Sequence, residues 1–144
     1  VEDDSRNIIA ITLSERRDGE AAARALRKAR AEAGFAPEIL VSDGSPAYPP
    51  AIAETMPGAR HVVAQFKGTP VSQRGRLVTV SNNLLERLNG TLRGFKSLKA
   101  GSNALTILGA VYNLLRPHQG LGGLTPFQAA GGGGLTWHTL AKAL

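Results

Sequence analysis

The sequence predicts an α/β domain in which short strands alternate with helices. Three runs rich in β-branched residues, at 8–13, 38–42 and 60–66, are typical of buried strands. Between and after them lie segments whose apolar residues recur at helical spacing. Of the 144 residues, 42% are hydrophobic and 19% are charged, which excludes a disordered chain and allows a folded core.

Capping and helix-ending residues set the bounds of the helices in the first half of the chain. Residues 20–33 predict a helix that Asp18 can cap at its start and Gly34 can end. A short helix is expected at 48–56, after Pro46. These two helices alternate with the predicted strands, which supports the α/β class.

The second half is predicted to be mainly helical. Residues 67–80 mix glycine, proline, glutamine and basic residues, and therefore predict a loop. A long helix is expected at 84–98, with Ser81 or Asn82 available as its cap. The remaining expected elements are a helix at 104–115, a glycine turn at 120–123, a helical turn at 126–130, a glycine tract at 131–134 and a short amphipathic helix around Trp137.

Charge is divided unevenly along the chain. The net charge of +6 consists of −3 in residues 1–56 and +9 in residues 57–144, where Glu86 is the one acidic residue. A basic half of this kind points to a polyanionic partner, most simply a nucleic acid. A role in solubility is the simpler alternative, and charge by itself leaves both open.

The sequence also excludes several classes of protein. It has no cysteine, so it forms no disulfide, thiolate zinc site or cysteine nucleophile, and this fits a reducing cell interior. No run of about 18 apolar residues predicts a membrane span, and the first residues do not resemble a signal peptide. We therefore expect a cytoplasmic protein that has no membrane partner.

Two carboxylates are candidate metal ligands. Asp43 follows a predicted strand, and open α/β sheets bind ligands outside the carboxyl ends of their strands. Glu86 lies in the first turn of the long helix, opposite its apolar stripe. Carboxylates suit Mg²⁺ or Mn²⁺, and two such ions can activate a hydroxyl and stabilise the leaving oxygen in phosphoryl transfer. The simpler alternatives, an Asp-Gly turn and a contact with the helix dipole, stay open for each residue alone.

A further pattern follows the second predicted helix of this half. Residues 112–126 combine a helix end, a proline stop, a glycine turn and a Thr-Pro helix start. Within this stretch, His118 could contact a phosphate or a metal ion. A polar side chain that holds the turn is the simpler interpretation.

Three segments in this order carry a family likeness. They are Ser42-Asp43-Gly44-Ser45-Pro46-Ala47-Tyr48 with Ala51-Ile52, then Asn82 through Arg93, then Tyr112-Asn113 through Arg116-Pro117-His118 to Thr125-Pro126 and Ala130-Gly131. Together they resemble the catalytic domain of DDE-type transposases of prokaryotic insertion sequences, in the retroviral-integrase superfamily with a ribonuclease-H-like fold. The resemblance implies a catalytic core over 1–131, followed by a glycine-rich linker and short tail at 132–144.

The resemblance also implies a function. Metal-dependent phosphoryl transfer would cleave DNA at the element end and join it to target DNA. Asp43 and Glu86 would be the second and third acids of the catalytic, metal-binding triad, with Mg²⁺ or Mn²⁺ as cofactor. The implied partners are element-end and target DNA and further copies of the chain, in the prokaryotic cytoplasm at the nucleoid. The candidate DNA contacts are Lys67, Arg74, Arg76, Arg93, Lys96, Lys99 and Arg116.

One departure from the family pattern bears on activity. In the family the first catalytic aspartate lies on an opening strand, upstream of the part that residues 1–14 resemble. We therefore expect the opening strand and the first acid to be missing, with Asp4 as the one possible substitute, and strand transfer to be impaired. Two alternatives stay open: a non-catalytic DNA-binding or assembly module, and a related nuclease. The 42 residues between Asp43 and Glu86 exceed the spacing in many members, so the loop at 67–80 is where an insertion is expected.

Overall fold

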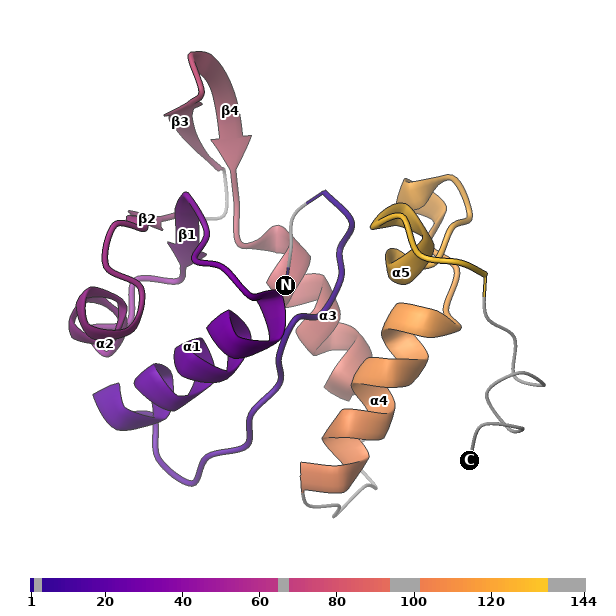
Figure 1. Ribbon diagram of the computed structural model, residues 1–144, viewed down its shortest axis with the longest axis horizontal. Helices are drawn as coiled ribbons and strands as arrows, with labels where there is room; N and C mark the ends of the chain where they lie inside the picture. The colour runs from indigo at the N-terminus through magenta and orange to yellow at the C-terminus, as the bar shows by residue number, and fades with distance from the viewer. Residues whose placement is uncertain (2–3, 65–67, 94–101, 135–144) are drawn as a thin grey trace. The chain divides into compact units, whose positions relative to one another are not determined.

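A computed structural model of the chain describes residues 1, 4–64, 68–93 and 102–134 (Figure 1). Two compact units are present, one formed by Ser14–Lys96 and the other by Val1–Leu13 with Ser97–Leu144. Helices and short strands are mixed, which confirms the α/β class. The helices in the described part of the chain are all too short or too polar to span a bilayer. The helix expected around Trp137 lies outside the described residues.

The unit Ser14–Lys96 holds most of the elements. Its helices are α1 (Gly19–Ala33), α2 (Tyr48–Thr55) and α3 (Asn83–Arg93), and its strands are β1 (Ile39–Ser42), β2 (Arg60–Val63), β3 (Thr69–Gln73) and β4 (Arg76–Val80). The other unit holds α4 (Ser102–Leu114), a 3₁₀ turn (Gln119–Leu121) and α5 (Pro126–Ala129). The bounds of α1, α2, α4 and α5 lie within two residues of the predicted ones.

Helix α1 begins and ends at the predicted residues. The side chain of Asp18 accepts a hydrogen bond from the amide of Ala21 at 2.9 Å, which satisfies one of the free amides of the first turn. Gly34 ends the helix with a φ of 77°, and its amide donates to the carbonyl of Arg30 at 2.9 Å. This left-handed conformation suits glycine, which has no Cβ to clash.

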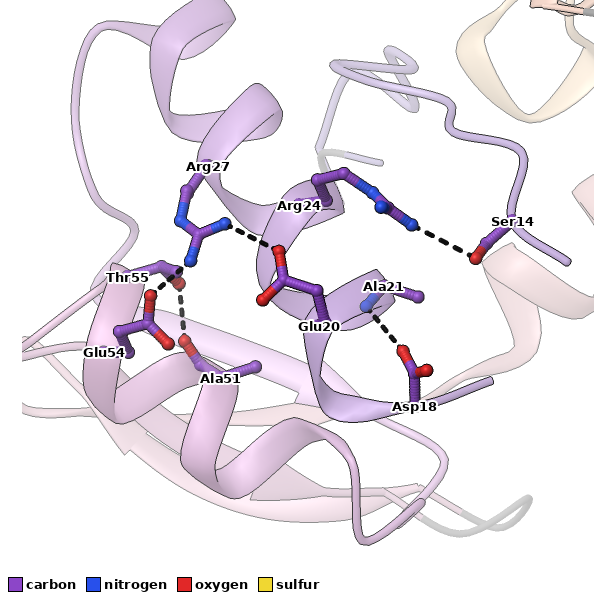
Figure 2. A network of polar contacts seen from close by, with 9 residues as sticks. All are labelled: Ser14, Asp18, Glu20, Ala21, Arg24, Arg27, Ala51, Glu54 and Thr55. Atoms are coloured by element: carbon purple, nitrogen blue, oxygen red, sulfur yellow. Dashed lines mark hydrogen bonds and ion pairs between the residues drawn. The ribbon is translucent and has the colours of Figure 1, made fainter. Parts of the chain in front are cut away.

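Arginine side chains join α1 to α2, which lie side by side. Figure 2 shows Arg27 between Glu54 of α2 and Glu20 of its own helix, the latter at 3.3 Å. Arg30 donates to the backbone carbonyl of Thr55 at 2.7 Å, at the end of α2, where helix carbonyls lack intrahelical partners. Solvent screens ion pairs that are this exposed, so these contacts contribute little to the stability of the unit.

Two small sheets share the core of this unit. Strands β1 and β2 pair in parallel, and α2 lies in the connection that parallel pairing requires. Strands β3 and β4 pair antiparallel. The side chains at the centre of the core are Ala64, Val71 and Val80, with Ile39, Val41, Val62 and Val78 packed against them.

The loop predicted at 67–80 is wrong, because residues 69–80 form a β-hairpin (Figure 1). Its turn is Arg74-Gly75, whose φ angles of 48° and 75° are both positive, as a two-residue type I′ turn requires. Asn-Gly and Asp-Gly are the usual signals of such a turn, and Arg-Gly is not among them. The alternation of inward and outward side chains was the remaining sign of a strand, since Val78 packs on the core while Leu77 is 78% exposed.

The strand predicted at 8–13 is also wrong, since these residues form no strand pairing among the residues described. The side chain of Asn113 on α4 holds both backbone groups of Ile8 instead. Its Oδ1 accepts from the amide of Ile8 and its Nδ2 donates to the carbonyl, each at 2.8 Å. A side-chain amide carries the same donor and acceptor as a peptide unit, so it takes the place of a neighbouring strand at this one residue.

Candidate functional site

Asp43 lies directly after β1, at the carboxyl end of the strand. It is exposed, and its Oδ1 accepts a hydrogen bond from the amide of Ser45 at 3.2 Å, which makes an Asx turn. The turn predicted as the simpler alternative is therefore present. It does not compete with ligand binding, because an ionised carboxylate offers about four acceptor positions and the turn uses one.

A buried hydroxyl lies behind this turn. Ser42 is 3% exposed, and its Oγ lies 2.8 Å from Nε2 of His61 on β2. The same oxygen accepts a hydrogen bond from the amide of Gly44 at 3.2 Å. Neither Ser42 nor His61 stands out in the sequence as functional. The only signal was that Ser42 directly precedes Asp43 in the first of the three segments.

Gly44 is required by the geometry of the same turn. Its φ is 82°, a conformation that residues with a side chain rarely adopt. A Cβ at this position would lie only 2.9 Å from Cγ1 of Val63 on β2. Backbone conformation and space therefore both select glycine directly after Asp43.

Tyr48, at the start of α2, responds to the charge of Asp43. Burial raises the pKa of the Tyr48 phenol above its usual 10.0, and the negative charge of Asp43 raises it further. The positive charge of Arg17 acts in the opposite direction and lowers this pKa. Tyr48 is therefore a natural reporter of the charge at position 43.

Glu86 lies in the first turn of α3 and is exposed. Its amide donates to the carbonyl of Asn82 at 3.1 Å, so the helix is regular at this point. Leu88 is 4% exposed and belongs to the buried side of the helix, whereas Leu85 is 39% exposed. Glu86 lies on the solvent side, as predicted.

The donor chemistry of Asp43 and Glu86 fits a hard divalent ion, because carboxylate oxygens are the ligands that Mg²⁺ and Mn²⁺ prefer. The two residues lie on separate elements of the unit Ser14–Lys96. Ion pairs among the described residues use other acids, namely Glu20, Glu38 and Glu54. Within residues 1, 4–64, 68–93 and 102–134, no three acidic or histidine side chains gather into a group that could hold a metal ion.

Two of the predicted DNA contacts lie at the tip of the hairpin. Arg74 is in the turn, where its side chain is 85% exposed and its Nε lies 3.3 Å from Oε2 of Glu38. Arg76 begins β4 and is exposed. Arg60 on β2, which the sequence did not single out, donates to the carbonyl of Ser72 at 2.6 Å. Three arginines therefore belong to β2 and the hairpin.

Of the other predicted DNA contacts, Arg116 is the one whose side chain the structure describes. Arg116 is exposed and belongs to the other unit. Arg93 ends α3, but its side chain is not among those described. Lys67, Lys96 and Lys99 lie outside the described residues. Their roles stay predictions.

His118 holds the turn after α4 through its backbone. Its amide donates to the carbonyl of Leu124 at 2.9 Å, and its carbonyl accepts from the amides of Leu121 at 2.9 Å and Gly123 at 3.0 Å. Its ring packs edge-on against Tyr112, with ring centroids 4.6 Å apart. The turn is therefore held by the backbone of His118 and not, as predicted, by its side chain; the ring packs against Tyr112 instead.

The environment of the His118 ring disfavours its protonated form. Burial lowers its pKa below the usual 6.5, and the positive charges of Arg116 and Arg6 lower it further. Its Nε2 is buried and has no hydrogen-bond partner in the described part of the chain. None of these contacts involves a second potential metal ligand.

Comparison with known proteins gives one match. A family model described as a DDE domain matches residues 1–118, more than four fifths of the chain. The matched range contains both candidate carboxylates, the hairpin, and the pair of hydrogen bonds between the Asn113 side chain and the backbone of Ile8, which we call the clasp. No curated protein and no solved structure matches the chain.

Proposed function

We propose that this chain, which belongs to the DDE-domain family of insertion-sequence transposases, acts in DNA transposition by metal-dependent phosphoryl transfer. Transposases bind DNA, and members of this family generally use a divalent metal ion. The observation that carries the proposal is Asp43: an exposed carboxylate at the carboxyl end of β1, within the matched range and in a turn that selects glycine as the next residue.

A ribonuclease-H-like fold is part of the proposal. The order α1, β1, α2, β2 with β1 and β2 parallel supports it, as does the position of Asp43 at the end of a strand. The hairpin β3–β4 then accounts for the long spacing between Asp43 and Glu86 as an insertion. In this proposal residues 1–131 form the catalytic core, and residues 132–144 form a linker and tail.

Asp43 and Glu86 would hold Mg²⁺ or Mn²⁺. Such an ion, when bound, activates an attacking hydroxyl and stabilises the leaving oxygen of the phosphodiester. The chain contributes the two carboxylates, and its basic side chains would bind the DNA backbone. Among the described basic side chains, Arg74 and Arg76 both lie at the tip of the hairpin. The active form would be a homo-oligomer on element-end and target DNA at the nucleoid.

The metal site is tested by Mn²⁺ titration of the whole chain, followed by electron paramagnetic resonance. Asp43→Asn and Glu86→Gln each remove a negative oxygen ligand, so we expect each to weaken Mn²⁺ binding by roughly tenfold or more. Glu32→Gln removes an exposed acid of α1 and is the control that should bind as the original chain does. Unchanged affinity in both site variants would show that these carboxylates bind no metal.

A non-catalytic DNA-binding or assembly module is the second candidate. It is favoured by the lack of a three-ligand group among the residues described. The Mn²⁺ titration distinguishes the two candidates, because the module would bind DNA without specific metal binding at Asp43 and Glu86. A labelled element end incubated with target DNA and Mn²⁺ then separates joining from hydrolysis: joined products indicate a transposase, and shortened products alone indicate a nuclease.

A further inference from the structure

A line of hydrogen bonds connects β2 to the turn that carries Asp43. Nε2 of His61 lies 2.8 Å from Oγ of Ser42, and the amide of Gly44 donates to the same Oγ at 3.2 Å. The carbonyl of Ser42 accepts from the amide of Ala64 at 3.1 Å. Ser42 is thus bound to the β2 segment through its side chain and its backbone, directly before Asp43.

The strand register explains why His61 reaches Ser42. In the parallel ladder Ser42 is paired with Val63 and Leu40 with His61. His61 is therefore the diagonal neighbour of Ser42, two positions along β2, and the two side chains lie on the same face of the sheet. A shift of one residue in either strand would move the imidazole to the other face.

The two bonds use different sites of the Ser42 hydroxyl. A serine hydroxyl donates one hydrogen and accepts two. Because the amide of Gly44 is a donor, Oγ is the acceptor there, and the contact with Nε2 of His61 uses either the hydroxyl hydrogen or the second lone pair, according to the tautomer of the ring. With either tautomer the imidazole restricts the rotation of the hydroxyl while Oγ accepts from the amide of Gly44.

The turn needs such an anchor because of its residues. Gly44 has more conformational freedom than any other residue, and its φ of 82° is one of many values open to it. The space beside Gly44 is too small for a side chain, since an added Cβ would lie 2.9 Å from Cγ1 of Val63. After it, the amide of Ser45 donates to Oδ1 of Asp43. The bond from Gly44 to Ser42 completes the set that holds the Asp43 backbone.

We infer that His61 is a positioning residue which, through the buried hydroxyl of Ser42, fixes the Asp43-Gly44 turn and so presents the Asp43 carboxylate to a divalent metal ion. The inference rests on the proposed function and extends it to a pair of residues on neighbouring strands. Groups that orient metal ligands typically affect metal affinity by roughly 10- to 100-fold when they are removed. His61 acts here on the backbone of the ligand and not on its carboxylate.

The test uses the whole chain and four variants. His61→Leu removes the ring nitrogens at similar volume, Ser42→Ala removes the hydroxyl, and His61→Gln restores a hydrogen-bond partner for Ser42, with an acceptor oxygen and a donor nitrogen. Ser72→Ala is the matched control, because Ser72 is an exposed strand serine that meets Arg60 through its carbonyl. Mn²⁺ affinity, the hydrogen-exchange rate of the Gly44 amide and the melting temperature are measured for each.

We expect His61→Leu and Ser42→Ala to weaken Mn²⁺ binding roughly tenfold and to speed exchange at the Gly44 amide. His61→Gln should restore both, and Ser72→Ala should alter neither. A purely structural role would lower the melting temperature without a change in metal affinity once folding is complete. Ser42→Ala keeps the packing of the His61 ring and decides the matter if His61→Leu does not fold.

Asp43→Asn separates failure of the inference from failure of the proposed function. If Asp43→Asn loses Mn²⁺ while His61→Leu and Ser42→Ala bind it as the original chain does, the positioning role is wrong and the metal site stands. If Asp43→Asn binds Mn²⁺ unchanged, the metal site and the positioning role are both wrong. Equal effects of His61→Gln and His61→Leu on affinity would also overturn the inference, since the restored hydrogen-bond partner would then not matter.

Discussion

Asp43 serves two purposes with one carboxylate: Oδ1 shapes the turn by binding the amide of Ser45, while the group as a whole stays exposed. Its negative charge also acts on Tyr48, whose pKa is raised first by burial and then by Asp43. Removal of the charge at position 43 is therefore expected to change the pKa of a neighbouring phenol, independently of any DNA chemistry.

Replacement of Asp43 by asparagine should lower the pKa of Tyr48. It removes the negative charge that disfavours the phenolate, whereas burial remains and keeps the pKa above 10.0. Ultraviolet titration of tyrosine in a Tyr112→Phe background isolates Tyr48, the other tyrosine of the chain. Glu32→Gln, as a control, should leave the titration unchanged. A Tyr48 pKa that stays the same in Asp43→Asn would mean that the two groups do not interact.

His118 should make the stability of its unit depend on pH. Its folded pKa is lowered by burial, then by Arg116 and Arg6, below the 6.5 of the unfolded chain. Unfolding therefore takes up a proton in this range, so the stabilisation is present above 6.5 and is lost as pH falls through the folded pKa. The melting temperature should drop between about pH 7 and pH 5, and less so in His118→Asn.

Nuclear magnetic resonance titration of His118 tests whether the neighbouring arginines lower its pKa. Arg116→Ala removes one of the two positive charges that lower the pKa of His118, so that pKa should move back toward 6.5. Arg87→Ala removes an exposed arginine of the other unit and should not move it. Equal shifts in both variants would assign the effect to net charge and not to Arg116.

At the scale of elements, the hairpin β3–β4 differs from its surroundings in how its turn is made. Arg74 has a positive φ of 48°, which costs a residue with a side chain roughly 1–2 kcal/mol. Its exposed ion pair with Glu38 returns only part of this cost. The hairpin therefore has an exposed arginine at its tip in a conformation that residues with a side chain rarely adopt.

Two glycines with equal space around them should respond oppositely to alanine. Gly75 in the hairpin turn and Gly90 in α3 both have open space where a Cβ would lie, but only Gly75 has a positive φ, of 75°. Gly75→Ala should therefore destabilise the chain by about 1 kcal/mol, and Gly90→Ala should stabilise it by a similar amount. Urea unfolding measures both, and the same sign for both would refute the turn geometry.

The elements also show which parts of the fold sequence reasoning can reach. Helix α1 was predictable because its cap Asp18 and its end at Gly34 act within a few residues. The clasp of Asn113 on Ile8 was not, because it joins residues 105 positions apart and β propensity does not reveal what a segment will pair with. His61 and Ser42 were missed for a related reason: the register of β1 and β2 brings them together, and no local pattern encodes it.

Over the whole molecule, charge is the property most relevant to function. The balance of −3 in residues 1–56 against +9 in residues 57–144 would favour contact with DNA through the second half. The division into two compact units does not follow this boundary, since the acidic half contributes to both. Specific contacts must therefore be separated from the effect of net charge by experiment.

The salt dependence of DNA binding distinguishes specific phosphate contacts from the effect of net charge. If Arg74 and Arg76 each contact a phosphate, replacing both with alanine should reduce the slope of log affinity against log salt by about 2. Arg16→Ala with Arg24→Ala removes the same charge from exposed positions in the acidic half and should leave the slope nearly unchanged. Equal losses of slope in the two double variants would exclude the hairpin as a DNA contact.

The clasp between Asn113 and Ile8 also has a mechanical consequence. Strands in a ladder share a pulling force among many bonds along their length, whereas the two backbone groups of Ile8 are held by one side chain. Tension along residues 8–13 would therefore act on Ile8 through this one side-chain amide and through its own buried side chain, and would not be spread over a ladder of strand bonds.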